Sequence, residues 1–199
     1  MHGDEEWLAK GARRLLPVAE IPLAGRHNLA NVLAAMALAE VAKAPFDAMK
    51  RTVVRFKGLA HRTEPVAERD GVRWINDSKG TNVGATLAAL SGMTGPVVLI
   101  AGGDGKGADF SALKSACAAH ARAVVLMGRD APLIEAALAN VVPVVQAADM
   151  TQAVRRAREL AQPGDVVLLS PACASFDMFR NFEQRGDAFR AAVNASLAA

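Results

Sequence analysis

The chain has 199 residues, of which 52% are hydrophobic and 22% charged, and its formal net charge is +3 from 23 basic and 20 acidic side chains. This composition excludes a disordered chain, and the length allows one full domain and part of a second. The basic residues form no dense run, so nucleic acid is not an expected partner. The longest apolar runs are far shorter than the roughly 20 residues that span a bilayer, and the N-terminus is too polar for a signal peptide. We therefore expect a cytoplasmic protein without a membrane partner.

The two cysteines, Cys117 and Cys173, each stand among small apolar residues. Because neither has a second cysteine near it, two free buried thiols are favoured over a disulfide. Cys173 is also a candidate nucleophile, but no histidine lies near it in the sequence, so a core thiol is the favoured interpretation.

The first 58 residues are expected to be mainly helical. Apolar residues recur at helical spacing from His27 to Lys43, and a second helix is predicted from Phe46 to Val54. Gly58 then interrupts the pattern and marks a predicted domain boundary. Residues 1–26 contain only short apolar pieces, too little for a core of their own, so this part is expected to be the end of a larger domain.

From residue 59 onward, predicted strands and helices alternate. Thr63–Ala67 and Val72–Ile75 flank an Asp-Gly pair that indicates a hairpin. The later elements are a helix at 82–91, a strand at 96–101, a helix at 111–120, a strand at 123–127, a helix at 131–139, a short strand at 141–146, a helix at 150–161, a strand at 166–169 and a helix at 182–196. Continuous Val, Leu and Ile runs between helices are typical of parallel strands covered on both faces. We predict an α/β fold with a Rossmann-like, doubly wound and mostly parallel sheet.

Three polar clusters, at 76–82, 102–109 and 170–177, each follow a predicted strand. Ligands bind at the carboxyl ends of the strands in such sheets, so the coincidence favours a real site. The first cluster places Lys79 two residues after Asp77, which a plain turn does not need. An ordinary polar loop is the alternative interpretation.

The second cluster is rich in glycine and contains Lys106. Glycines let backbone amides face an anion, and Lys106 adds a positive charge. The spacing is not that of a Walker loop, and no hydroxyl residue follows Lys106 to hold magnesium. A flexible loop with an exposed lysine is the alternative.

Three further features have a functional and a plainer interpretation. Ser175 can cap a helix, or it can offer its hydroxyl to a carboxylate. Asn28 and Asn31 lie three residues apart on a helix face, where they can read a base edge or simply cap the helix. Arg62, beside the predicted boundary, can reach a phosphate with bidentate geometry or remain solvated.

Taken in order, the stretches GRHNLAN, GLAHR, INDSKGTN, GGDGKGADF and SPACASFDMFRNFEQRG resemble the Mur ligases of peptidoglycan synthesis over essentially the whole chain. Within that family, the Asp-Ser-Lys that starts at Asp77 is similar to the branch that adds D-glutamate. The resemblance implies that 1–58 is the end of the central ATPase domain and 59–199 is the C-terminal, amino-acid-binding domain.

The resemblance also implies an activity. An ATP-dependent amide ligase of this kind joins D-glutamate to UDP-N-acetylmuramoyl-L-alanine through an acyl phosphate, with Mg²⁺ as the metal. The Walker loop and the metal ligands belong to parts of the family that this chain does not match, so no metal-binding residue is expected here. The chain alone is expected to be a monomer without turnover.

Site residues are carried over from the family position by position. Asn28 and Asn31 correspond to the pair near adenine, and Arg62 and Asp77 to residues at the phosphates and ribose. The expected D-glutamate contacts are Lys79, Thr81, Lys106, Ser175, Phe176 and Phe182. Lys79 and Arg62 are also the expected catalytic residues.

A stand-alone Rossmann-like module that binds a nucleotide or an amino acid without catalysis is the alternative function. A dehydrogenase is disfavoured, because no predicted strand is followed by Gly-x-Gly-x-x-Gly with an acid about 20 residues further on.

Overall fold

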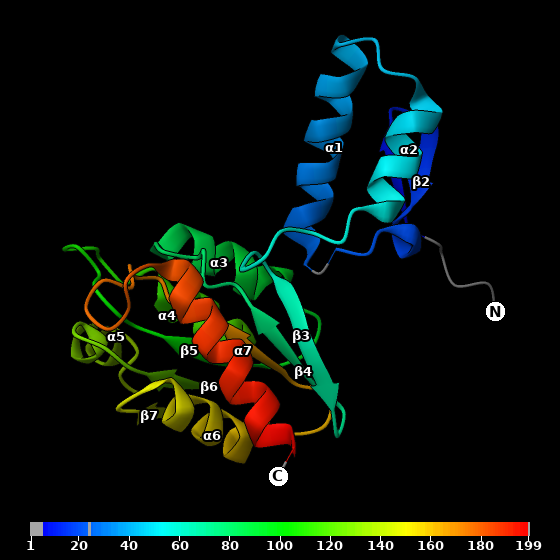
Figure 1. The fold of residues 1–199 in the computed structure, drawn as a ribbon. Helices are drawn as coiled ribbons and strands as arrows, with labels where there is room; N and C mark the ends of the chain where they lie inside the picture. The colour runs from blue at the N-terminus through cyan, green and yellow to red at the C-terminus, as the bar shows by residue number, and fades with distance from the viewer. Residues whose placement is uncertain (1–5, 24, 199) are drawn as a thin grey trace. The chain divides into compact units, whose positions relative to one another are not determined.

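The structure is a computed structural model that describes residues 6–23 and 25–198. Its chain forms two compact units, Met1–Gly58 and Leu59–Ala199, which are described separately (Figure 1). None of the helices in the described ranges combines the length and the apolar character that crossing a membrane requires.

The first unit consists of a hairpin and two helices. Strands β1 (Trp7–Lys10) and β2 (Arg13–Pro17) pair antiparallel, and a short 3-10 helix (Val18–Glu20) leads towards α1 (Arg26–Val41) and α2 (Phe46–Arg55). Both helices were predicted, but the hairpin was not. Its buried Leu8 and Leu16 form a small core with α1 residues Val32 and Met36. The apolar pieces before residue 26 therefore do share in a core, because α1 supplies the rest of it.

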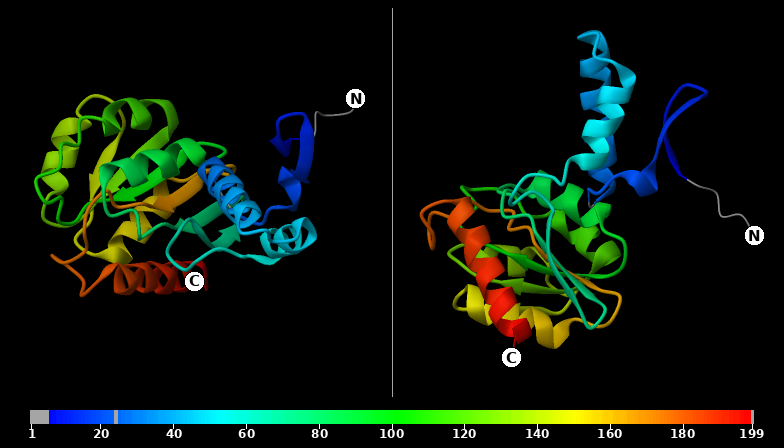
Figure 2. Two further views of the ribbon diagram at one scale, coloured as in Figure 1. Left: turned by 90° about the horizontal axis from the view of Figure 1, so that it is seen from above. Right: turned by 45° about the vertical axis from the view of Figure 1, so that its right-hand side comes forward.

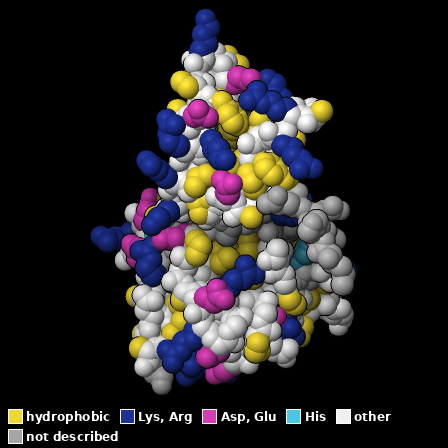
Figure 3. All heavy atoms as spheres, turned by 90° about the vertical axis from the view of Figure 1, so that its right-hand side faces the viewer, with side chains coloured by type: hydrophobic (Ala, Val, Ile, Leu, Met, Phe, Trp, Pro, Cys, Tyr) yellow, Lys and Arg dark blue, Asp and Glu magenta, His cyan; other side chains and the backbone are white. Residues whose placement is uncertain are grey.

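The surface of the first unit carries both apolar and charged side chains. Helix α1 is apolar on more than its buried side, since Leu38 is 73% exposed and Val41 is 83% exposed. Figure 3 shows apolar side chains interspersed with lysines and arginines on the face turned to the viewer.

The second unit contains a six-stranded sheet whose order is β3-β4-β8-β5-β6-β7. The strands are β3 (Glu64–Arg69), β4 (Val72–Asn76), β5 (Val97–Ala101), β6 (Ala121–Leu126), β7 (Val144–Gln146) and β8 (Val166–Leu169). Only β3 and β4 pair antiparallel, and the other four pairings are parallel. Asp70 and Gly71 both have positive φ, as a tight hairpin turn requires. The prediction of a mostly parallel, doubly wound sheet is confirmed.

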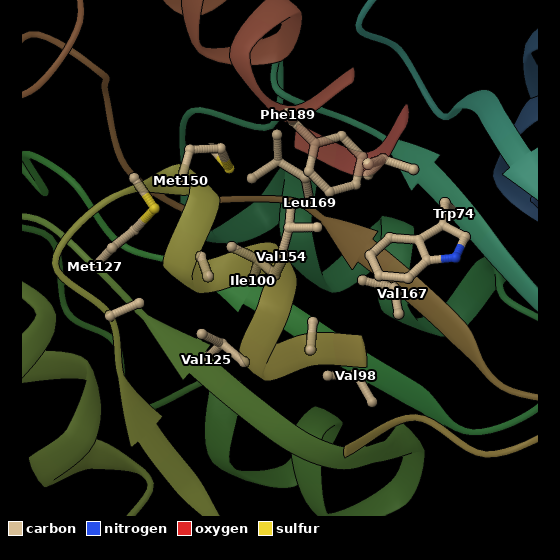
Figure 4. Packing of buried hydrophobic residues seen from close by; sticks show 14 of the residues in the cluster. Trp74, Val98, Ile100, Val125, Met127, Met150, Val154, Val167, Leu169 and Phe189 are labelled. Carbon is tan, nitrogen blue, oxygen red and sulfur yellow. The ribbon is translucent and has the colours of Figure 1, made fainter. Parts of the chain in front are cut away.

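Helices cover both faces of the sheet, as the two views in Figure 2 show. They are α3 (Val83–Gly92), α4 (Leu113–His120), α5 (Ala131–Ala137), α6 (Met150–Leu160) and α7 (Phe182–Ala198). Helices α6 and α7 pack together on one face, and α3 packs against α4 on the other. Every second residue of each central strand faces α6 and α7, where Trp74, Ile100, Leu169 and Phe189 form part of one buried cluster (Figure 4).

Candidate functional site

The three polar clusters follow three neighbouring strands, because β8 lies between β4 and β5. Backbone hydrogen bonds join the loops that leave these strands: Ala172 N donates to Gly80 O (2.9 Å), and Gly102 N donates to Pro171 O (2.9 Å). Asp104 and Ala174 exchange two such bonds, of 3.0 and 2.8 Å. The three loops therefore form one connected wall at the carboxyl edge of the sheet.

Asp77 holds the middle of this wall together. It is only 8% exposed, and its Oδ2 accepts a hydrogen bond from Ser170 Oγ (2.8 Å) while Oδ1 accepts one from the Thr63 amide (3.1 Å). Gly80 makes this packing possible, because a Cβ at that position would lie 2.6 Å from Ser170 Oγ. The Asp77 carboxylate thus links the start of the β3–β4 hairpin to the β8 loop.

Lys79 lies on the ring of Phe182, the first residue of α7. Its Nζ is 3.9 Å from the ring centroid, a distance at which a cation is attracted to the ring face. The Lys79 amide donates to His61 O (3.0 Å), and Ser78 Oγ donates to Phe182 O (2.8 Å). Thr81 follows as a half-buried residue whose amide donates to Lys79 O (2.8 Å). The backbone on both sides of this lysine–phenylalanine pair is therefore fixed.

Lys106 forms a second lysine–phenylalanine pair, with Phe176 of the β8 loop. Its Nζ lies 5.6 Å from the ring centroid, and Phe176 is 66% exposed. Lys106 is exposed as well, and it has a positive φ of 53° that its amide stabilises by donating to Asp104 Oδ1 (3.0 Å). This pair is open to solvent.

Ser175 is buried beside Phe176, but it does not cap a helix. Its carbonyl accepts hydrogen bonds from the amides of Met178 (3.1 Å) and Phe179 (2.8 Å), so it begins a turn. Helix α7 begins seven residues later in the chain, and Asn181 accepts a hydrogen bond from the Gln184 amide (2.8 Å) at that point. The capping interpretation of Ser175 is wrong, because Asn181 is placed to cap the helix.

Arg62 is exposed in the second unit, and within the described part of the chain its guanidinium has no hydrogen-bonding partner. Asn28 and Asn31 belong to the first unit, where Asn31 Nδ2 donates to Asn28 Oδ1 (3.1 Å). The capping interpretation of this pair is wrong too, because Gly25 is the N-cap of α1. The amides instead lie next to each other on the first turns of the helix.

Sequence reasoning missed Arg185, which is only 2% exposed. Its guanidinium donates to Ser78 Oγ (3.0 Å), Ser78 O (2.8 Å) and Cys173 O (3.1 Å), so one side chain holds two loops of the wall. Burial lowers the pKa of Arg185 to about 10. The helical spacing of Phe182, Arg185 and Phe189 is the signal that could have placed this arginine on the buried face of α7.

Both cysteines are free and buried, which confirms the prediction of core thiols. Burial raises the pKa of Cys173 to about 12, and nearby Asp130 adds to the effect. Burial alone raises the pKa of Cys117 to about 11. A thiol with so high a pKa is a poor nucleophile at neutral pH, so Cys173 is part of the packing.

The described residues differ in how well they fit magnesium and how well they fit ATP. The described residues contain no group of three His, Cys, Asp or Glu side chains that could hold a metal ion. Arg62 has the donors that a phosphate needs, because its side chain is exposed.

A doubly wound, mostly parallel sheet whose polar loops leave the carboxyl ends of β4, β8 and β5 defines an α/β domain of the Rossmann-like class. The chain belongs to the Mur ligase family: residues 61–173 match the family described as "Mur ligase, glutamate ligase domain". It is 62% identical over 191 residues to UDP-N-acetylmuramoylalanine--D-glutamate ligase from Aromatoleum aromaticum. That match covers 94% of this chain but 41% of the relative, so the chain spans about two fifths of the relative's length.

Solved structures share the fold at low sequence identity. UDP-N-acetylmuramate-alanine ligase from Thermotoga maritima matches with a TM-score of 0.66 and 16% identity, covering 94% of this chain and 42% of that one. The bifunctional folylpolyglutamate synthase/dihydrofolate synthase from Yersinia pestis matches with a TM-score of 0.64 and 22% identity, covering 96% and 43%.

Proposed function

We propose that this chain carries the D-glutamate-binding domain of a Mur ligase that joins D-glutamate to UDP-N-acetylmuramoyl-L-alanine in the cytoplasm. The observation that supports this most directly is the pair of lysines at the ends of β4 and β5, each resting on a phenylalanine. Glutamate carries two carboxylates, and two ammonium groups at one edge of a sheet can neutralise both.

The remaining D-glutamate contacts complete a shell around those charges. Lys79 and Thr81 form one side and Lys106 the other, with Ser175 offering its hydroxyl. The ammonium groups of Lys79 and Lys106 lie over the rings of Phe182 and Phe176. The Phe182 amide stands at the first position of α7, where helical geometry leaves an N–H without an intrahelical partner, so it can donate to a carboxylate.

The nucleotide is assigned to the other residues. Asn28 and Asn31 would contact adenine, while Arg62 would contact phosphate and Asp77 the ribose. ATP, when bound, supplies the phosphoryl group that converts the substrate carboxylate into an acyl phosphate. The amine of D-glutamate then bonds to the acyl carbon, loses a proton and displaces phosphate. Lys79 and Arg62 are the proposed catalytic residues, because their positive charges would stabilise the negative charge that develops on the reacting oxygens.

The chain alone should not turn over, because its sequence has no Walker loop and its described residues contain no group of three His, Cys, Asp or Glu side chains that could hold a metal ion. We propose that it acts as part of a monomeric, longer enzyme. Incubating the chain with D-glutamate, ATP, magnesium and UDP-N-acetylmuramoyl-L-alanine should release no phosphate above background. Phosphate release by the isolated chain would contradict this part of the proposal.

The test of the site uses a chimera that joins the amino-terminal part of the Aromatoleum aromaticum relative to this chain. Lys79→Ala and Lys106→Ala should each raise the KM for D-glutamate by about tenfold or more, since each removes a charged hydrogen-bonding partner. Lys106→Ala should change the KM for ATP by less than about twofold. Lys114→Ala, at an exposed position of α4, is the matched control.

Two results would overturn the assignment. A Lys106→Ala chimera whose ATP requirement rises more than its D-glutamate requirement would remove Lys106 from the amino-acid site. A tight affinity of the isolated chain for D-glutamate, equal to that of the chimera, would favour the stand-alone binding module instead.

A further inference from the structure

His61 is buried next to the exposed Arg62, and its backbone has an unusual conformation. It is 7% exposed, and its φ is +62°, in the left-handed region that is uncommon for residues other than glycine, although asparagine, aspartate and histidine enter it more often than the rest. Such a residue persists only where its surroundings fix it on several sides.

Backbone and side chain of His61 are both held by hydrogen bonds. Its amide donates to Glu64 Oε2 (3.0 Å), and its carbonyl accepts from the Lys79 amide (3.0 Å). Asn76 Nδ2 donates to His61 Nδ1 (3.1 Å). The orientation of the Asn76 amide follows from its other end, because Oδ1 accepts from the Ser78 amide (3.1 Å), which can only donate. His61 Nδ1 is therefore an acceptor, and the ring proton is on Nε2.

The imidazole is enclosed by α7. Nε2 lies 3.9 Å from Asp187 Oδ1, and the ring stands at 81° to the ring of Phe182 with 6.0 Å between centroids. A Cβ at residue 186 would lie 2.1 Å from His61 Nδ1, so only glycine allows the imidazole to lie against this turn of the helix.

His61 thus contacts both partners of the first lysine–phenylalanine pair. Its carbonyl fixes the backbone of Lys79, and its ring supports the ring of Phe182 on which the Lys79 ammonium lies. The next residue in the chain is Arg62. We propose that His61 is a positioning residue that sets the Lys79–Phe182 pair for D-glutamate and links it, through one peptide bond, to Arg62 of the nucleotide side. This inference deepens the proposed function and depends on it.

The test separates the ring from the backbone with two substitutions in the chimera. His61→Asn removes the imidazole but keeps a residue that tolerates positive φ, so the KM for D-glutamate should rise about three- to tenfold while the KM for ATP stays within about twofold. His61→Val strongly disfavours positive φ, so it should raise both KM values. His120→Asn, at the end of α4, is the matched histidine control.

A second readout uses the 199-residue chain itself. In ¹⁵N–¹H and aromatic spectra, His61→Asn should shift the Lys79 amide and the Phe182 ring resonances. The Trp74 indole resonance, which comes from the middle of β4 and from a ring packed in the buried cluster with Phe189, should stay unchanged and so report an intact fold. His120→Asn should leave all three in place.

The outcomes distinguish this inference from the proposed function. If Lys79→Ala raises the KM for D-glutamate and His61→Asn leaves both that KM and the Phe182 resonances unchanged, His61 has no positioning role. If Lys79→Ala itself leaves D-glutamate use unchanged, the proposed function fails first. A His61→Asn variant that changes the KM for ATP as much as that for D-glutamate would also overturn the separation of ring from backbone.

Discussion

The two lysine–phenylalanine pairs differ in how firmly the protein holds them. Lys79 is half-buried, its amide and carbonyl are hydrogen-bonded, and the turn around it is closed by Asp77, Ser170 and Arg185. Lys106 and Phe176 are both exposed, and 5.6 Å separates the Lys106 Nζ from the centroid of the Phe176 ring. One half of the proposed site is therefore organised before any ligand arrives, whereas the other can adjust to it.

Removing Arg185 should break the organised half most strongly. Arg185→Leu leaves the buried acceptors at Ser78 and Cys173 without a donor, and unsatisfied buried groups of this kind cost about 1 to 3 kcal/mol each. We expect a loss of about 3 kcal/mol in the free energy of unfolding, measured by urea titration. Arg180→Leu, an exposed arginine in the same segment, should change it by less than about 0.5 kcal/mol. Equal effects of the two substitutions would contradict the role given to Arg185.

Adding one methyl group to each half compares their packing directly. Gly80→Ala places a Cβ 2.6 Å from Ser170 Oγ and 2.7 Å from Asp77 Oδ2, and we expect it to destabilise the chain by about 2 kcal/mol. Gly107→Ala, beside Lys106, meets no atom within 4 Å, so only its positive φ costs energy, about 1 kcal/mol. If thermal or urea unfolding shows that Gly107→Ala destabilises the chain more than Gly80→Ala does, the loop around Lys79 is not the more tightly packed of the two.

The smallest expected effect concerns pH and the thiol behind the organised half. Cys173 has a pKa raised to about 12 in the folded chain from an ordinary value of 9.0, so the unfolded chain loses this proton first. The contribution of the neutral Cys173 thiol to the free energy of unfolding is therefore fully present below pH 9, and it falls as the pH rises further. Between pH 8 and 10 the urea midpoint should fall less in Cys173→Ala than in the unchanged chain. An identical slope in both would argue against a buried neutral thiol.

Local patterns were sufficient to predict most of the fold. The alternating runs from residue 59 onward gave every helix and strand of the second unit, with differences of a few residues at their ends. The β1–β2 hairpin was missed, because Leu8 and Leu16 become a core only when Val32 and Met36 of α1 cover them. Contacts distant in the sequence decide such a case, and no short window contains them.

The site was predictable in its location but not in its connections. Ligands bind at the carboxyl ends of the strands in a parallel sheet, and this principle predicted that Lys79 and Lys106 lie at the same edge of the sheet. The sequence could not show that Asp77 points inward to Ser170, since an aspartate in a polar turn is usually solvated. Arg185 was overlooked for the same reason, although it contacts two of the three loops.

The place of β8 has a consequence for how the second unit forms. The last strand in the sequence lies between β4 and β5, so neither of these central strands has its full set of neighbours until residues 166–169 are available. A ribosome must therefore release most of the domain before the sheet can close. Fragments that stop before residue 166 would expose two unpaired strand edges, and such edges are ready templates for aggregation. The same insertion that brings the three loops together makes their assembly one of the final events of folding.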